Sequence, residues 1–204
     1  MRLRVLDHGH RGRQRVVLRL MRVVTRTEPD PVAKVSLYRP ELFGRAWLRL
    51  IESVMRGPSA WTATERELMA AFVSMLNRCP FCVGIHGGIA SLHRHEAVPG
   101  EDLDLWRDGR FGSRLTAMFE FLEKTTLTPD VISPEDAGRV RAAGLSDDAV
   151  ADALYVAFIF NTVNRLANAF DFGWETDTDR IRLARSLDRI RYHVPAFALR
   201  TPRR

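Results

Sequence analysis

The segment NRCPFCVGIHGG, residues 77–88, holds the side chains of this chain that are best suited to redox or metal chemistry. Cys79 and Cys82 are separated by two residues, His86 follows four residues later, and the chain contains no other cysteine. Two thiols at this spacing in a reducing compartment are typical of a redox-active dithiol or a metal site, and not of a disulfide framework. The first question is therefore which of these two chemistries the surrounding elements favour.

The expected position of the two thiols follows from Pro80. Proline is excluded from a helix interior but fits at the first helical position. We therefore expect one helix to end near Asn77 and a new helix to start after a tight turn, with Cys79 at its N-cap. Residues three and four apart share a helix face, so Cys79, Cys82 and His86 form one stripe. The helix N-terminus favours a thiolate at Cys82 in the first turn, and Cys79 is also a candidate for the thiol of low pKa.

Glu67 lies on the preceding predicted helix. In one straight helix it would be ~22 Å from Cys82, at 1.5 Å per residue, but a turn at residues 77–80 allows the two helices to fold back. Glu67 then orients His86, which exchanges a proton with a thiol or a leaving oxygen. Alternatively, Glu67 only closes a capping box with Thr64.

Three other interpretations compete with this proton relay. Two thiolates, an imidazole and a carboxylate are a plausible zinc set, although no second Cys or His pair exists elsewhere in the chain. His86 can instead be a core histidine with satisfied hydrogen bonds. A thioredoxin fold would need a strand before the dithiol, and no strand pattern is present.

The pair Gly87-Gly88 allows another backbone to come close.

Composition limits the class of protein. The 204 residues suit one domain, and no apolar run approaches the ~20 residues that span a membrane. The formal net charge is +6, with arginines concentrated in residues 1–27 and in the C-terminal part. No nucleic-acid-binding motif accompanies them, so we interpret these charges as solvated helix faces and a loose tail and expect no nucleic-acid partner. A nucleic-acid-binding helical protein that uses the basic ends is the alternative. We expect a soluble, cytoplasmic protein without a membrane partner.

Helix signals dominate the whole chain, and no stretch alternates convincingly between apolar and polar residues. The prediction is an all-α, single-domain helical bundle: residues 1–30 form an N-terminal helical extension and residues 31–204 form the domain. The expected helices cover residues 11–27, 33–37, 40–55, 64–77, 79–93, 111–124, 134–143, 146–169 and 178–192. The helix over 146–169 is apolar nearly all round, so it should be central.

The span ERELMAAFVSMLNRCPFCVGIHGG, residues 65–88, resembles the core of the alkylhydroperoxidase D-like, or carboxymuconolactone decarboxylase, superfamily. Glu67, Cys79, Cys82 and His86 match the pattern E-x11-C-x-x-C-x3-H of its peroxidatic branch. Three further segments resemble the peroxidase-related subgroup more weakly: YRPELFG, AAGLSDDAV and FNTVNRLANAF. The resemblance implies the all-α fold of that family and assembly as a homo-oligomer, a trimer or hexamer.

The resemblance also implies a reaction. Cys82 would attack a hydroperoxide and become a sulfenic acid, Cys79 would condense with it to a disulfide, and His86, oriented by Glu67, would relay the proton. This peroxidase would use no metal or organic cofactor, and an unidentified thiol or protein would reduce it. The chain has Phe81 where some peroxidase members carry a histidine. The alternatives are a redox-sensing or zinc-binding helical module and a carboxymuconolactone decarboxylase-like enzyme, although decarboxylase members generally lack the dithiol.

Overall fold

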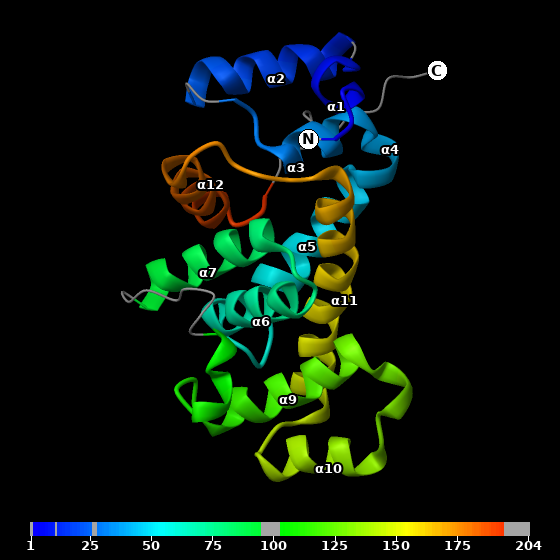
Figure 1. Ribbon diagram of the computed structural model, residues 1–204, viewed down its shortest axis with the longest axis vertical. Coiled ribbons are helices and arrows are strands. Elements are labelled where there is room, and N and C mark those ends of the chain that lie inside the picture. The colour runs from blue at the N-terminus through cyan, green and yellow to red at the C-terminus, as the bar shows by residue number, and fades with distance from the viewer. Residues whose placement is uncertain (1, 11, 26–27, 95–102, 194–204) are drawn as a thin grey trace.

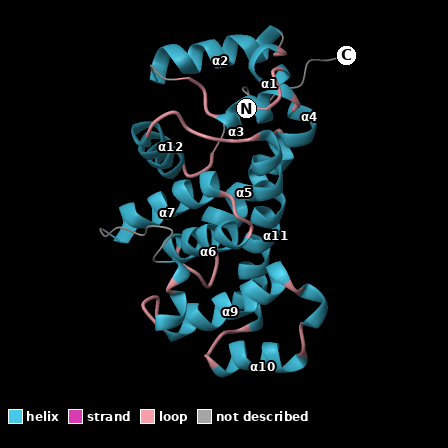
Figure 2. Cartoon of the chain, viewed as in Figure 1, coloured by secondary structure: helices cyan, strands magenta, loops and turns pink. Residues whose placement is uncertain are grey.

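The computed structural model describes residues 2–10, 12–25, 28–94 and 103–193 (Figure 1). All the regular structure in these residues is helical, and none of them lies in a strand (Figure 2). The predicted all-α class is therefore confirmed. The long helix α11 (Asp147–Phe170) runs along the molecule, with α2 (Gly12–Thr25) near one end and α10 (Pro134–Ala142) at the other (Figure 1).

The N-terminal part consists of α1 (Val5–His8), α2 and α3 (Pro31–Tyr38). Helix α3 begins at Pro31 because the Asp30 carboxylate caps it, accepting a hydrogen bond from the Ala33 N–H at 2.9 Å. Within this part the Lys34 ammonium of α3 lies 2.7 Å from Asp7 of α1. The Arg2 N–H bonds this part to the rest of the chain, donating to the Phe170 carbonyl of α11 at 3.0 Å. The boundary at residue 30 between an extension and a domain stays a prediction.

The helix predicted over residues 40–55 is two helices, α4 (Pro40–Phe43) and α5 (Arg45–Arg56). Gly44 breaks the helix with a ψ of −134°. A Cβ atom added there would lie 1.8 Å from the Pro40 carbonyl oxygen, so the turn requires glycine. The sequence prediction was wrong here because the apolar pattern continues across a break that one glycine makes.

The remaining helices form the bundle around the site. They are α6 (Ala63–Leu76), α7 (Pro80–Arg94), α9 (Ser113–Leu127), α10, α11 and α12 (Asp177–Ile190), with short 3-10 turns at Trp106–Asp108 and Pro129–Val131. Helix α6 is the centre of the core, because every residue from Arg66 to Ser74 is buried. On it, the Phe72 ring stacks on Phe119 of α9 with centroids 4.3 Å apart.

Helix α11 is central on one side only. Its buried face includes Val156, Ile159 and Phe160, as the apolar pattern predicts. On the opposite face Tyr155 and Phe158 are 58% and 55% exposed. The expectation of a fully central helix was therefore wrong for this face.

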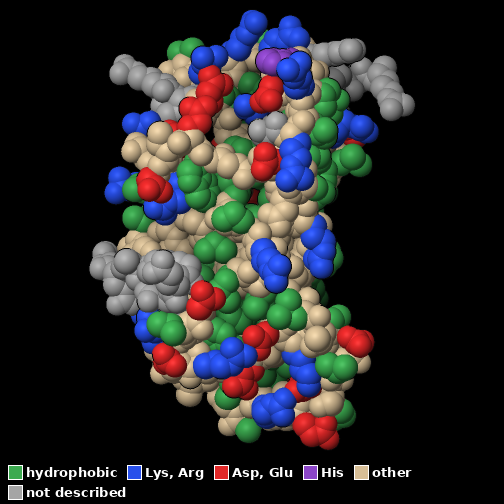
Figure 3. Space-filling model, in the orientation of Figure 1, with side chains coloured by type: hydrophobic (Ala, Val, Ile, Leu, Met, Phe, Trp, Pro, Cys, Tyr) green, Lys and Arg blue, Asp and Glu red, His purple; other side chains and the backbone are tan. Residues whose placement is uncertain are grey.

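None of the helices in the described part of the chain is both long enough and apolar enough to cross a membrane. On the face drawn in Figure 3, arginine and lysine side chains are distributed over the surface among acidic ones, with apolar side chains between them.

Candidate active site

The dithiol sits in the tight turn between α6 and α7. Helix α6 ends at Leu76, and Arg78 adopts the left-handed conformation, with φ of 52°, that reverses the chain. The Cys79 carbonyl accepts the first helical hydrogen bond, from the Val83 N–H at 3.0 Å, so Cys79 is the N-cap and Pro80 the first helical residue. The structure thus has the break that Pro80 predicted.

The two thiols differ in their surroundings. The Cys79 sulfur accepts hydrogen bonds from the Cys82 thiol and from backbone N–H groups of Phe81 and Cys82. These bonds outweigh burial and lower the pKa of Cys79 to about 7. The pKa of Cys82 is raised well above its ordinary value, first by its hydrogen bond to Cys79 and then by burial. The structure therefore favours a thiolate on Cys79, the second of the two candidates, and not on Cys82.

Asn164 of α11 is the polar partner of both thiols. Its side chain is fully buried, and its hydrogen bonds with Cys79 and Cys82 lower the pKa of each. Two polar side chains of other elements hold the Asn164 amide in place. Its Nδ2 donates to Ser74 Oγ at 2.9 Å, and its Oδ1 accepts from Asn77 Nδ2 at 3.1 Å. Sequence reasoning missed Asn164, although an asparagine inside a predicted buried helix is a signal, because a buried amide needs partners.

Glu67 and His86 are brought together by the fold-back of α6 and α7. Glu67 Oε2 lies 2.7 Å from His86 Nδ1, and the Glu67 side chain is fully buried. The capping box of α6 is instead made by Thr62 and Glu65, so the alternative role of Glu67 in a capping box was wrong.

Two further side chains bind Glu67, and sequence reasoning missed both. Arg56, at the end of α5, is 5% exposed and places Nη2 2.6 Å from Glu67 Oε1. Tyr192, which follows α12, donates its hydroxyl hydrogen to Glu67 Oε1 at 2.9 Å. The Tyr192 oxygen also lies 3.3 Å from His86 Nδ1. No local sequence pattern predicts that either residue contacts Glu67, because each comes from a different part of the chain.

These contacts decide the charges of the cluster. Burial alone would raise the pKa of Glu67, but the hydrogen bond with His86 and the charge of Arg56 outweigh it, so the pKa of Glu67 is lowered. Burial and the Glu67 charge raise the pKa of Tyr192 well above its ordinary value. Glu67 is therefore an anion and Tyr192 a neutral donor at neutral pH.

The other ring nitrogen of His86, Nε2, has no hydrogen-bond partner within the part of the chain that the structure describes. The ring packs edge-on against Phe160, with centroids 4.5 Å apart. In the neutral ring that donates from Nδ1 to the Glu67 anion, Nε2 carries the lone pair. His86 also lies one helical turn after Cys82, so the imidazole and this thiol project from the same face of α7.

Glycines on α7 let α12 and the segment before it come close. A Cβ atom on Gly84 would lie 2.5 Å from the Trp174 ring, and one on Gly88 would lie 3.3 Å from Ala184 of α12. The Gly87-Gly88 pair was expected to admit another backbone; at Gly88 the neighbour is the Ala184 side chain, and at Gly84 it is the Trp174 ring. Phe81, between the cysteines, stacks on Trp174 with centroids 5.3 Å apart. This packing covers the dithiol, since both cysteines are buried.

Within the described ranges, no group of three or more His, Cys, Asp or Glu side chains is arranged to hold a metal ion. The carboxylate and imidazole of the zinc set considered from the sequence are hydrogen-bonded to each other. The two thiols are likewise hydrogen-bonded to each other and to Asn164.

Fold and site together define a helical protein with a buried dithiol beside a carboxylate–histidine pair. Residues 41–97 match the sequence model of the Carboxymuconolactone decarboxylase family. The chain is similar to a crystal structure described as an uncharacterized peroxidase-related protein from Silicibacter sp. TM1040. Identity is 25%, the match covers 78% of this chain and 83% of that one, and the TM-score is 0.68.

A second structure, from Ralstonia eutropha JMP134, is described as an alkylhydroperoxidase AhpD core and an uncharacterized peroxidase-related protein. Identity is 22%, the match covers 88% of this chain and 93% of that one, and the TM-score is 0.69. A search of curated proteins found no match. The family match over residues 41–97 and the fold shared with the two structures support the predicted resemblance to the alkylhydroperoxidase D-like, carboxymuconolactone decarboxylase superfamily.

Proposed function

We propose that this protein is a thiol-dependent peroxidase that reduces hydroperoxides through Cys79 and Cys82. The observation that carries the proposal is the pair of hydrogen-bonded thiols, of which Cys82 lies one helical turn from His86, while His86 Nδ1 is held by Glu67. The printed descriptions of the two structural neighbours, both peroxidase-related, support it.

The proposed reaction oxidises the dithiol and reduces the peroxide. A cysteine thiolate attacks the distal peroxide oxygen, so an S–O bond forms, the O–O bond breaks, and the alcohol leaves with one proton from the relay. The sulfenic acid then condenses with the other thiol, releasing water and leaving the Cys79–Cys82 disulfide. A thiol or dithiol reductant returns two electrons and two protons. Because turnover needs a reducing compartment, we propose a cytoplasmic setting.

The family resemblance assigns the attack to Cys82, whereas Cys79 is the thiol of lower pKa. The two assignments are compatible if the proton that the sulfurs share moves from Cys82 to Cys79 or to His86 before the attack. The proposal keeps Cys82 as the attacking thiol, because His86 is one turn from Cys82 and two turns from Cys79.

The test is a count of free thiols before and after one equivalent of cumene hydroperoxide. The proposal predicts the loss of two thiols per chain in native protein, and none in a Cys79→Ser, Cys82→Ser double variant treated in the same way. An unchanged number of free thiols in the native protein would contradict the peroxidase proposal.

The order of the thiols is tested by trapping the sulfenic acid in the two single variants. The expected result is that Cys82→Ser abolishes trapping while Cys79→Ser preserves it. The reverse pattern assigns the attack to Cys79, the thiol that the structure holds as the thiolate.

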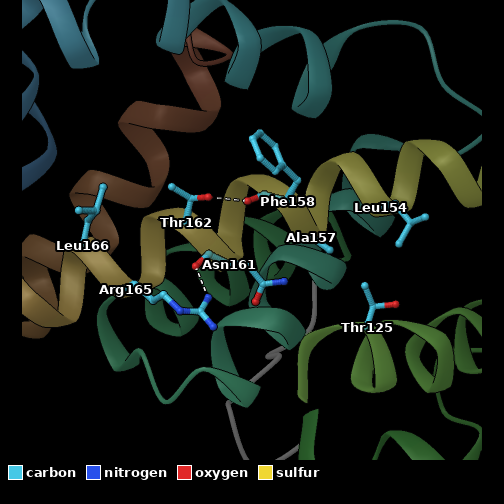
Figure 4. A pocket seen from close by; sticks show the side chains of 8 residues that line it. All are labelled: Thr125, Leu154, Ala157, Phe158, Asn161, Thr162, Arg165 and Leu166. Carbon is cyan, nitrogen blue, oxygen red and sulfur yellow. Dashed lines mark hydrogen bonds between the residues drawn. The ribbon is translucent and has the colours of Figure 1, made fainter. Parts of the chain in front are cut away.

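We also propose that the chain forms a homo-oligomer through the exposed face of α11. A pocket of about 530 Å³ lies on this face, lined by Thr125 of α9 and by α11 residues that include Leu154, Phe158 and Leu166 (Figure 4). Its lining is mostly apolar, and Tyr155 next to it is exposed. Light scattering should give a trimer or hexamer for the wild type and a smaller species for Phe158→Arg; a wild-type monomer would contradict this proposal.

A further inference from the structure

The Glu67 carboxylate collects hydrogen-bond donors from three helices other than its own. His86 Nδ1 comes from α7, Arg56 Nη2 from α5, and the Tyr192 hydroxyl from the end of α12. The only one of these donors that the dithiol motif contains is His86. The other two both bind Oε1 of this carboxylate, at 2.6 and 2.9 Å, while His86 binds Oε2 at 2.7 Å. The three donors together therefore hold both oxygens in place.

The backbone at Tyr192 is strained. Arg191 and Tyr192 both adopt positive φ values, 52° and 62°, a conformation that bulky residues rarely take. The Tyr192 N–H closes the end of α12 by bonding to the Leu187 carbonyl at 3.3 Å. A left-handed tyrosine whose hydroxyl reaches a buried carboxylate is the kind of strain that surrounding structure maintains at functional sites.

Arg56 is held against both of its neighbours in the cluster. Its guanidinium carbon lies 4.8 Å from the centre of the Tyr192 ring, and Nη1 donates to the Met55 carbonyl at 2.9 Å. Nη2 also lies 3.4 Å from Asp188 Oδ1 on α12. One buried cation therefore connects the Glu67 carboxylate, the Tyr192 ring and helix α12.

We propose that Tyr192 and Arg56 are positioning residues of the proton relay. Together they hold Glu67 as an anion with Oε2 directed at His86 Nδ1, which leaves His86 Nε2 as the proton acceptor. Neither residue touches a reacting atom; both act through Glu67. The inference rests on the proposed peroxidase function for its catalytic consequence, although the arrangement of charges can be tested without it.

The charges that face Glu67 from all sides agree with this role. Arg56 supplies a cation from α5, and Arg66, its neighbour on α6, donates instead to the carbonyls of Val54 and Gly57. Asp188 of α12 is shared between Arg56 and His93, whose Nε2 lies 2.8 Å from Asp188 Oδ1. Arg56 is thus the one cation among the described residues that forms an ion pair with Glu67, apart from His86 when it is protonated.

The consequence for the chemistry is a fixed tautomer. If Glu67 were protonated it would donate to His86 Nδ1, and the ring would carry its hydrogen on Nε2 and lose its function as a base. A neutral Tyr192 and a cationic Arg56 both favour the carboxylate over the acid. Their removal should therefore favour uptake of a proton from solvent by Glu67, with the His86 hydrogen shifting from Nδ1 to Nε2, and should slow the thiol reaction.

The first experiment measures the pKa of Glu67 by carbon NMR of its carboxyl group, and the His86 tautomer by nitrogen NMR. Tyr192→Phe keeps the ring and removes one donor, and Arg56→Gln removes the cation. Both variants should raise the pKa of Glu67 and increase the fraction of His86 that carries its hydrogen on Nε2. Arg56→Lys should recover the wild-type tautomer, because it restores the charge.

Two matched variants control for general disturbance. Tyr38→Phe removes a hydroxyl from a tyrosine of the N-terminal part, and Arg66→Gln removes a buried guanidinium that donates to the backbone carbonyls of Val54 and Gly57. Both should leave the His86 tautomer as in the wild type. If Tyr192→Phe and Arg56→Gln also leave the Glu67 pKa and the His86 tautomer unchanged, the proposal is overturned.

The second experiment measures single-turnover oxidation of the dithiol by cumene hydroperoxide. The rate constant should fall by about tenfold in Tyr192→Phe and by more in Arg56→Gln. The rate constant of Arg56→Lys should lie between those of the wild type and Arg56→Gln. A rate unchanged by both substitutions contradicts the catalytic role. A wild-type protein that does not react defeats the peroxidase function alone, since the NMR measurements still decide whether Tyr192 and Arg56 position Glu67.

Discussion

The Tyr192 hydroxyl oxygen lies 2.9 Å from Glu67 Oε1, although 125 residues separate the two in the sequence. The contact joins the central helix α6 to the end of α12 at a point where both side chains are buried. Since the same carboxylate orients His86, the site depends on the correct docking of a helix that contributes no residue to the dithiol motif.

Replacing Glu67 by glutamine should lower stability strongly. The substitution leaves the buried Arg56 without its closest anion, and breaking a buried pair in this way costs about 3–5 kcal/mol. Urea unfolding of Glu67→Gln measures the loss. The control is Glu65→Gln, which alters only the exposed capping box of α6 and should cost about 1 kcal/mol or less. Equal midpoints for the two variants would show that Arg56 does not need Glu67.

The stability that Glu67 contributes should depend on pH. The pKa of Glu67 is lowered from 4.5 in the folded protein, so its contribution is fully present above about pH 4.5 and is lost as the pH falls through the lower folded value. Urea unfolding at about pH 5 and about pH 3 should therefore show a smaller drop in Glu67→Gln than in the wild type. Parallel drops in the two proteins would contradict the lowered pKa.

Ultraviolet titration of the reduced protein should detect one thiolate that forms at about pH 7, from Cys79, and a second that forms only well above pH 9.0, from Cys82. In Cys82→Ala the pKa of Cys79 should rise towards its ordinary value, because the thiol hydrogen bond that chiefly lowers it is gone. In Cys79→Ala the pKa of Cys82 should fall, because the hydrogen bond to Cys79 that chiefly raises it is lost together with the neighbouring charge. A first thiolate that persists near pH 7 in Cys79→Ala would reverse the assignment.

Gly84 and Gly138 should respond in opposite ways to alanine. A Cβ atom on Gly84 would lie 2.5 Å from Trp174 and 2.9 Å from Arg180, so Gly84→Ala should destabilise the protein by about 1–3 kcal/mol. Gly138, inside α10, has no atom within 4 Å of that position, and Gly138→Ala should stabilise by up to about 1 kcal/mol. Thermal unfolding compares the two; a tolerated Gly84→Ala would mean that the segment around Trp174 moves away easily.

The parts of the site that local chemistry determines were predictable from the sequence. Pro80 predicts a helix start, and the start places Cys79 at the N-cap. The choice of capping box was not predictable in the same way, because Thr62 with Glu65 and Thr64 with Glu67 have identical spacing. Packing decides between them: Glu67 faces the core while Glu65 faces solvent.

The remaining partners were not predictable because tertiary contacts alone select them. Tyr192 and Arg56 reach Glu67 from α12 and α5, and an ordinary arginine or tyrosine in a helical sequence gives no sign of such a contact. The order of the two thiol pKa values had the same origin. It depends on which sulfur donates its hydrogen, and that follows from side-chain positions around Asn164.

The stack of Trp174 on Phe81 gives the molecule an intrinsic optical reporter. Phe81 stands between the two cysteines, so any rearrangement of the first turn of α7 when a disulfide forms changes the surroundings of the indole. The chain has four tryptophans, and Trp174→Phe supplies the blank for the other three. Fluorescence emission can therefore follow the oxidation and reduction of the dithiol in real time without an added label.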